Sequence, residues 1–327
     1  MEVSGISQPL VTVCVSTRNR PHFLPRLVSH LEQQSLGVAN FDAVIVDNGS
    51  TDDTWAVLQQ LAATSPVTIL PIQNPPGQGP AAGRNRAWRA ARAPLCAFTD
   101  DDCMPTPTWL EAAVAALGDR AVIAAGRVSP PWADTLKRGL YSRVVAVGEQ
   151  TAAWGATANL IVRRADLETV GGFDEVAFMR VAGEDTDLVW RVLSTGASFA
   201  YLDDALVHHG IENVGVRGLL RDHQRWIDVP LVMARNPKAR RSLLQHGLFW
   251  KPSHPRVLLL VLGLAMSRRA PASLLLALPW LHRQLCSEPY NVDTMERLVN
   301  LPALLLLDLS EVSVMVRGSA RHKALVL

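Results

Sequence analysis

Short apolar runs alternate with amphipathic segments through the first hundred residues of the chain. Apolar residues dominate positions 10–15, 41–46, 67–72 and 93–98, and these runs predict strands. Between them, residues 24–31 repeat leucine and valine at intervals of three and four, and residues 54–61 and 83–93 are expected as two further helices. Strands and helices alternating at this spacing predict a parallel sheet with right-handed crossovers.

Polar residues follow three of the expected strands at the point where each strand ends. They occupy positions 16–20, 47–50 and 100–102. Because ligands of such sheets bind beyond the carboxyl ends of the strands, we expect these three segments to converge on one crevice.

The most distinctive of these segments is the run FTDDDC, which holds Asp100, Asp101 and Asp102. Adjacent carboxylates repel one another unless a cation or solvent screens them. On an extended backbone Asp100 and Asp102 point to the same side, and two oxygen ligands on one face suit Mg²⁺ or Mn²⁺. The alternative interpretation is a solvated acidic turn.

Composition places few limits on the whole chain but separates its two ends. The 327 residues include 32 basic and 30 acidic ones, so the overall charge gives no argument for nucleic-acid binding. Between residues 217 and 256, however, nine Arg or Lys residues accompany only Asp222 and Asp228, which indicates an anionic surface or ligand for this stretch.

Cysteine usage and the N-terminus favour a cytosolic location. Four scattered cysteines show no metal-binding spacing and are expected to be reduced, mostly buried thiols. The first nine residues have neither a basic segment nor an apolar core, so we expect no signal peptide.

The C-terminal region, residues 211–327, contains three apolar runs at 257–266, 272–281 and 298–316. The last run contains Asp308 and Glu311, and none is a clean uncharged span of about twenty residues. Short apolar helices flanked by arginines are typical of a membrane interface. An ordinary helical subdomain or a dimer interface is the alternative.

The loop GQGPAAG resembles a dinucleotide-binding fingerprint, but its spacing, its prolines and its position after the third strand argue against one. The helix that follows begins near Arg84, whose guanidinium can approach a diphosphate or a base.

A second acidic group, GEDTDLVWR, opens a helix with Glu184 and Asp185 in its first turn. We expect Asp187 and Arg191, four residues apart, to pair on the helix surface. A carboxylate at this helix entry can accept a proton from a hydroxyl group. The strand 205–209 ends in His208 and His209, of which only one can reach the same side as a metal ligand.

The order of STRNRP, VDNGSTD, GRN, FTDDDCMP, VGGFDE and GEDTDLVWR resembles the inverting family 2 glycosyltransferases of the GT-A fold, over residues 9 to 210. The resemblance implies a mostly parallel central sheet flanked by helices, in a domain of residues 1–210 followed by the helical C-terminal region.

The resemblance also implies roles for individual residues. Those expected at the nucleotide sugar are Thr17, Arg18, Asp47, Arg84, Asp100 and Asp101. Asp102, Asp100 and His209 would hold Mg²⁺ or Mn²⁺, and Asp185 would be the catalytic base with Glu184 beside it. Trp154 and Gly155 would contact the acceptor.

The resulting expectation is transfer of a sugar from a nucleotide sugar to a hydroxyl acceptor, such as a lipid-linked or cell-envelope glycan, at the cytoplasmic face of a membrane. A nucleotidyltransferase that makes a nucleotide sugar, or a non-catalytic membrane-bound nucleotide-binding scaffold, remains an alternative.

Overall fold

The computed structural model describes residues 8–117, 122–286 and 292–327. The chain divides into two compact units, the first formed by residues up to Pro131 together with Val145–Gly210, and the second by Trp132–Val144 with Ile211–Leu327. Segment 132–144 therefore packs with the C-terminal region rather than with its sequence neighbours. The expectation that the chain has no signal peptide concerns its first nine residues, and residues 1–7 of these lie outside the described residues.

The first unit contains eight of the described strands, joined in one sheet in the order β3-β2-β1-β4-β8-β6-β9-β5. The strands are β1 Val11–Thr17, β2 Phe41–Asp47, β3 Thr68–Gln73, β4 Leu95–Phe98, β5 Cys103–Pro105, β6 Val122–Ser129, β8 Leu160–Arg163 and β9 Ser198–His209. Its helices are α1 Leu24–Glu32, α2 Thr54–Thr64, α3 Pro80–Ala90, α4 Trp109–Leu117, α6 Arg164–Val170 and α7 Glu184–Ser194, with short 3₁₀ turns η1 Ala152–Trp154 and η2 Thr157–Asn159.

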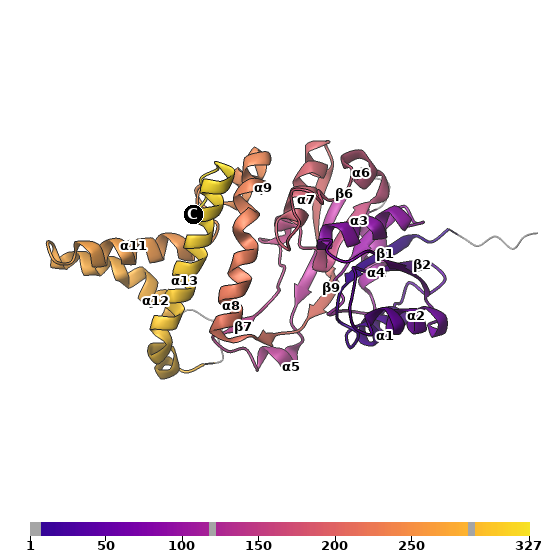
Figure 1. Cartoon of the computed structure of the whole chain (residues 1–327), viewed down its shortest axis with the longest axis horizontal. Coiled ribbons are helices and arrows are strands. Elements are labelled where there is room, and N and C mark those ends of the chain that lie inside the picture. The colour runs from indigo at the N-terminus through magenta and orange to yellow at the C-terminus, as the bar shows by residue number, and fades with distance from the viewer. Residues whose placement is uncertain (1–7, 118–121, 287–291) are drawn as a thin grey trace, which may run out of the picture. The chain divides into compact units, whose positions relative to one another are not determined.

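The expected α/β fold is confirmed. Strand β1 pairs in parallel with β2 and β4, β2 with β3, and β6 with β9, whereas β8 and β5 pair antiparallel to their neighbours. Right-handed crossovers place α1 and α2 on one side of the sheet and α3 on the other, because the strand order reverses at β1 (Figure 1).

Apolar burial holds these layers together. All seven residues of β2 are buried, and α1 buries Leu24, Leu27, Val28 and Leu31, the positions spaced at three and four in the sequence. Each such side chain contributes about 1.5–3 kcal/mol when it is fully buried. This packing fixes the strand ends from which the polar segments emerge.

The second unit is mainly helical. Its elements are α5 Trp132–Thr135, β7 Ser142–Arg143, β10 Glu212–Asn213, α8 Gly215–His223, η3 Gln224–Asp228, α9 Val229–Arg235, α10 Pro237–Leu243, α11 Ser253–Met266, η4 Pro271–Ala277, α12 Leu278–Cys286 and α13 Thr294–His322. Strands β7 and β10 form a small antiparallel pair that joins the two separate parts of this unit.

Helix α13 has 29 residues and a stretch of mean hydropathy 1.6, with 39% of that stretch buried within the protein. Among the described residues it is the one helix long and apolar enough to cross a membrane, although no clean span was expected in the sequence. Core helices of soluble proteins pass the same test, so α13 is weak evidence for a membrane span.

The turn after β2 depends on Gly49. Its φ is +75°, in the left-handed region, and a Cβ atom there would lie 2.6 Å from the Cα atom of Pro76. A side chain at this position is therefore both strained and obstructed by backbone.

We expect Gly49→Ala to lower the free energy of unfolding by about 3 kcal/mol, the sum of backbone strain and overpacking. Urea unfolding measures the change. Gly148→Ala is the matched control, since no atom lies within 4 Å of its added Cβ. Equal stability of the two variants would contradict this account of the turn.

Candidate active site

The three aspartates lie in a turn between β4 and β5 rather than on an extended strand. The backbone N–H of Cys103 donates to the carbonyl of Asp100 at 3.2 Å and closes this turn. The expected same-side arrangement of Asp100 and Asp102 on an extended backbone is therefore wrong, because the chain reverses through Asp101. The three carboxylates instead meet different partners.

Arg20 neutralises two of these carboxylates. Its Nη1 atom lies 2.9 Å from Oδ1 of Asp101 and 2.6 Å from Oδ2 of Asp102, and the Thr17 hydroxyl donates to Asp101 at 2.6 Å. Burial raises the pKa of Asp101 to about 6, although Arg20 and Thr17 oppose the shift. Arg20 had no role assigned from the sequence. Its position in STRNRP, among the polar residues that follow β1, could have indicated that it lies near the aspartates.

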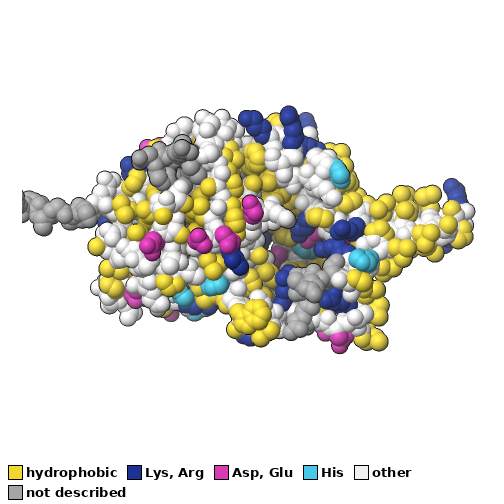
Figure 2. All heavy atoms as spheres, turned by 180° about the vertical axis from the view of Figure 1, so that it is seen from behind, with side chains coloured by type: hydrophobic (Ala, Val, Ile, Leu, Met, Phe, Trp, Pro, Cys, Tyr) yellow, Lys and Arg dark blue, Asp and Glu magenta, His cyan; other side chains and the backbone are white. Residues whose placement is uncertain are grey.

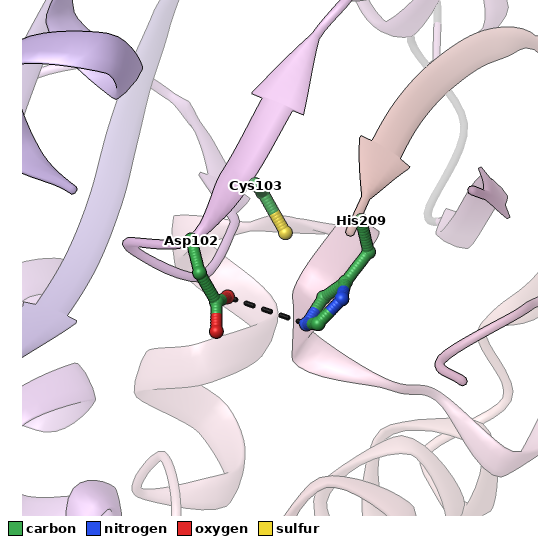
Figure 3. Close-up of side chains that lie close together, drawn as sticks. All are labelled: Asp102, Cys103 and His209. Atoms are coloured by element: carbon green, nitrogen blue, oxygen red, sulfur yellow. Dashed lines mark ion pairs between the residues drawn. The ribbon is translucent and has the colours of Figure 1, made fainter. Parts of the chain in front are cut away.

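Asp102 also faces His209 across the pairing of β5 and β9. The Nε2 atom of His209 lies 3.3 Å from Oδ1 of Asp102, and the Cys103 thiol lies beside both (Figure 3). His208 points elsewhere, with Nδ1 3.2 Å from the carbonyl of Ser129. Of the two histidines, His209 is therefore the one placed beside the aspartates.

The pKa values of this pair reflect mutual stabilisation. Burial acts to raise the pKa of Asp102, but His209 and Arg20 outweigh it and hold that pKa well below its ordinary value. Burial likewise acts to lower the pKa of His209, and Asp102 outweighs it, so the pKa of His209 is raised. Each group favours the charged form of the other.

The donor set beside Asp102 fits a divalent cation. Three potential ligand atoms lie within 4.8 Å of one another, one each from Asp102, Cys103 and His209. Oδ1 of Asp102 is buried and accepts no hydrogen bond from the described residues. Carboxylate and imidazole suit Mn²⁺, whereas burial raises the pKa of the Cys103 thiol well above its usual range, which keeps it a neutral and poor ligand. Asp102 and His209 are therefore the suitable ligands here.

Arg84 joins the aspartate turn to the second acidic group. From α3, its Nη2 atom lies 3.2 Å from Asp100 and its Nη1 atom 2.8 Å from Glu184 at the start of α7. Glu184 is 1% exposed, and its other oxygen accepts the backbone N–H of Ala182 at 2.8 Å. Two acidic segments distant in sequence thus share one buried guanidinium.

Asp185 lies next to this ion pair but is not tied to an arginine by a direct contact within the described residues. Its Oδ1 atom accepts the backbone N–H of Thr186 at 2.8 Å. Burial, together with the adjacent Glu184 carboxylate, raises the pKa of Asp185 to about 7. A carboxyl group with a pKa near neutrality is suited to accept a proton from a hydroxyl group.

The remainder of α7 is fixed by structural contacts. Asp187 pairs with Arg191 at 2.7 Å, as its spacing predicted. Gly155 packs against this helix, since a Cβ there would lie 2.2 Å from Val189, and the carbonyl of Trp154 accepts the Thr186 hydroxyl at 2.7 Å. The Trp154–Gly155 loop therefore lies beside the start of α7.

The remaining expected nucleotide-binding residues lie at the ends of β1 and β2. Thr17 pairs with Asp47 in the sheet register. Asp47 is buried and accepts the backbone N–H of Ser50 at 3.0 Å and the Gln73 amide at 3.2 Å, while Arg18 is exposed.

We expect Arg84→Met to lower the free energy of unfolding by about 3–5 kcal/mol, because it leaves Glu184 buried without a counter-charge. Adding Glu184→Gln should recover part of this loss in a double-mutant cycle measured by urea unfolding. Arg89→Met is the control, since the Arg89–Glu175 pair is exposed and its loss should cost less than about 1 kcal/mol. Strictly additive effects of the Arg84 and Glu184 changes would rule out the bridge.

The raised pKa of Asp185 predicts a pH-dependent effect on stability. Ionisation of Asp185 is less favourable in the folded protein than in the unfolded chain. The free energy of unfolding therefore decreases as the pH rises from 3.8, the ordinary pKa of an aspartate, to about 7, the raised pKa of Asp185. Asp185→Asn should therefore have a melting temperature that increases relative to wild type between pH 5 and pH 8. The exposed Asp203→Asn is the control. If the difference in melting temperature between Asp185→Asn and wild type did not change with pH, the pKa of Asp185 would not be raised.

A family model described as "Glycosyl transferase family 2" matches residues 12–171, which include the aspartate turn but not α7 or His209. A pre-mycofactocin glycosyltransferase of Mycobacterium tuberculosis is 30% identical over 223 residues, covering 63% of this chain and 44% of that protein. A validoxylamine A glucosyltransferase of Streptomyces hygroscopicus is 27% identical over 224 residues, covering 58% and 52%. The chain thus spans about half the length of these relatives.

Among solved structures, the mannosyltransferase PcManGT from Pyrobaculum calidifontis, in complex with GDP-Man and Mn²⁺, is similar with a TM-score of 0.58 and 20% identity, over 97% of this chain and 87% of that one. Staphylococcus aureus TarS, residues 1–349, gives a TM-score of 0.52 at 15% identity, over 96% and 91%. Residues 12–171 thus match the glycosyltransferase family 2 model, and the structural similarities show that the chain has a GT-A-type fold.

Proposed function

We propose that the chain is a metal-dependent, inverting glycosyltransferase that moves a sugar from a nucleotide-sugar donor to a hydroxyl acceptor. The bridge of Arg84 between Asp100 and Glu184 carries this proposal. It brings the aspartate turn, suited to a diphosphate and its cation, next to the helix entry where Asp185 lies. An inverting displacement needs these two groups around one substrate.

The donor is proposed to bind at the ends of β1, β2 and β4. We propose that Asp47, Thr17 and Arg18 contact the nucleoside. Arg84, Asp100 and Asp101 are proposed to contact the diphosphate sugar. PcManGT, whose structure contains GDP-Man and Mn²⁺, supports a nucleotide sugar as the class of donor. A divalent cation, Mg²⁺ or Mn²⁺, would be held by Asp102 and His209 and would supply Lewis-acid stabilisation of the leaving diphosphate. Asp100, which contacts Arg84, is not grouped with these ligands.

Asp185 is proposed to act as the general base. Its carboxylate takes the proton of the acceptor hydroxyl, whose oxygen forms a bond to the anomeric carbon of the sugar. The bond from that carbon to the diphosphate oxygen breaks on the opposite face, so the configuration inverts. Glu184, held by Arg84 and by the Ala182 N–H, keeps the helix entry in place. The Trp154–Gly155 loop, which lies beside α7, is proposed to contact the acceptor.

The acceptor is proposed to be a lipid-linked or cell-envelope glycan, reached at the cytoplasmic face of a membrane. The basic stretch 217–256 and the apolar C-terminal elements support a negatively charged, lipid-bearing partner.

Asp185→Asn should lower the rate of sugar transfer by about 10²–10⁴-fold, the range for loss of a general base, and leave nucleotide binding within about twofold of wild type. Asp102→Ala should weaken Mn²⁺-dependent GDP or UDP binding by about tenfold or more, because it removes a proposed ligand. Transfer rates and calorimetric titration with each nucleotide measure these effects, with Asp203→Asn as the control.

Normal transfer by Asp185→Asn would refute the base assignment. The reaction product separates the alternatives. The proposed glycosyltransferase releases a nucleoside diphosphate such as UDP or GDP from a nucleotide sugar, whereas a nucleotidyltransferase releases pyrophosphate from a nucleoside triphosphate. Failure to release either product from any donor in the presence of Mn²⁺ would favour the non-catalytic scaffold.

A further inference from the structure

Residues 253–286 of the second unit form a helical hairpin, here called the apolar hairpin, in which α11 is followed by η4 and α12. Gly263 allows the two arms to approach closely, since a Cβ there would lie 2.6 Å from the carbonyl oxygen of Ser273. The Ser273 hydroxyl donates to the Gly263 carbonyl at 2.8 Å. Val257, Leu260 and Trp280 pack with apolar residues of α13, so one end of the hairpin is anchored within the unit.

The parts of the apolar hairpin that do not pack against α13 expose large apolar side chains. The exposed fractions are 49% for Leu262, 51% for Leu264, 48% for Leu274, 65% for Leu275 and 56% for Leu278. Hydrophobic side chains gather over this hairpin in Figure 2. Soluble monomeric surfaces rarely present a continuous apolar patch of this kind, which marks a site of contact with a protein or a membrane.

The charge of this segment favours a membrane over a protein partner. Residues 251–286 contain five Arg or Lys residues and no Asp or Glu. Arg268 and Arg269 are exposed at the turn between α11 and η4. Apolar side chains flanked only by basic ones match a bilayer with acyl chains beneath anionic headgroups.

Helix α13 is not suited to be the membrane-contacting element, although its length and hydropathy would allow it. Glu311 contacts Lys251 at 2.7 Å and both His223 and His254 at 3.3 Å. Burial acts to raise the pKa of Glu311, but Lys251 and His254 outweigh it and hold that pKa at about 2.

Asp308, one turn before Glu311, accepts hydrogen bonds from Trp280 at 2.7 Å and Gln284 at 2.9 Å. Moving α13 into lipid would break these contacts and place two acidic groups in hydrocarbon, which is costly.

We propose that the apolar hairpin lies in one leaflet of an anionic bilayer, with Arg268 and Arg269 at the headgroups, while α13 remains inside its unit and does not span. This proposal rests on the membrane location included in the proposed function and identifies the element that makes the contact. The membrane contact itself does not depend on any chemical step of sugar transfer.

Flotation of the full chain with vesicles tests the proposal. The wild type should bind vesicles of phosphatidylcholine and phosphatidylglycerol more tightly than vesicles of phosphatidylcholine alone. Leu262→Glu with Leu275→Glu should weaken binding by at least about 100-fold, because two inserted side chains are lost. Arg268→Gln with Arg269→Gln should weaken binding to the anionic vesicles by about 25-fold, at about fivefold for each arginine.

Leu325→Glu is the matched control, since Leu325 is 59% exposed and lies outside the hairpin. Unchanged melting temperatures show that the variants fold. Absence of vesicle binding by the wild type, or equal binding by the leucine variants, overturns the proposal. A wild-type dimer that Leu275→Glu dissociates, without vesicle binding, assigns the surface to a second copy instead.

Transfer to a water-soluble acceptor separates this proposal from the proposed function. Hairpin variants that lose vesicle binding but keep transfer to that acceptor support both. Vesicle binding that depends on the hairpin, in a protein that transfers no sugar, supports the membrane contact and refutes the enzyme activity.

Discussion

The candidate site depends on one buried cation, the guanidinium of Arg84. It contacts Asp100 after β4 and Glu184 at the start of α7, two segments that no strand pairing connects. Helix α3 is itself held tightly in place, because a Cβ at Gly83 would lie 2.1 Å from the Ser16 hydroxyl of β1. The sheet therefore sets the position of Arg84, and Arg84 sets where the acidic helix entry meets the aspartate turn. Without this charge, the nearly inaccessible Glu184 carboxylate would have no ionic partner among the described contacts.

The distribution of positive charge gives neighbouring carboxyl groups different properties. Arg20 lies against Asp101 and Asp102, and Arg84 lies against Asp100 and Glu184. Among the described residues no arginine makes such a contact with Asp185, and burial, together with the adjacent Glu184 carboxyl group, raises the pKa of Asp185 to about 7. A second carboxyl group nearby makes a carboxyl group easier to protonate, whereas a nearby arginine favours its charged form and opposes the effect of burial. The different surroundings of these carboxyl groups are consistent with the different roles proposed for them.

Much of the fold could be predicted from the sequence, because strands β1 to β4 and helices α1 to α3 are encoded by local apolar patterns. Helix α3 begins at Pro80, three residues before the expected start, since proline is compatible with the first helical turn. The site was less accessible to this reasoning. The contacts of Arg20 with Asp101 and Asp102 join residues 81 and 82 positions apart, and periodicity carries no information on such pairs. The turn at Asp100 was only the alternative interpretation, because the alternation of side chains along a strand was extended beyond the point where β4 ends.

Hydropathy was least informative in the C-terminal region, since it cannot distinguish an apolar helix that the protein covers from one that it leaves exposed. Helix α13 and the arms of the apolar hairpin are both leucine-rich. The difference lies in polar contacts: Asp308 and Glu311 bind partners from α8, α11, α12 and the segment before α11, so α13 is a central helix of its unit. Leu274 and Leu275 are exposed, and the charged residues nearest to them in the sequence are arginines. Internal acids therefore mark which apolar helix is core, and their absence from residues 251–286 leaves the hairpin as the element free to meet lipid.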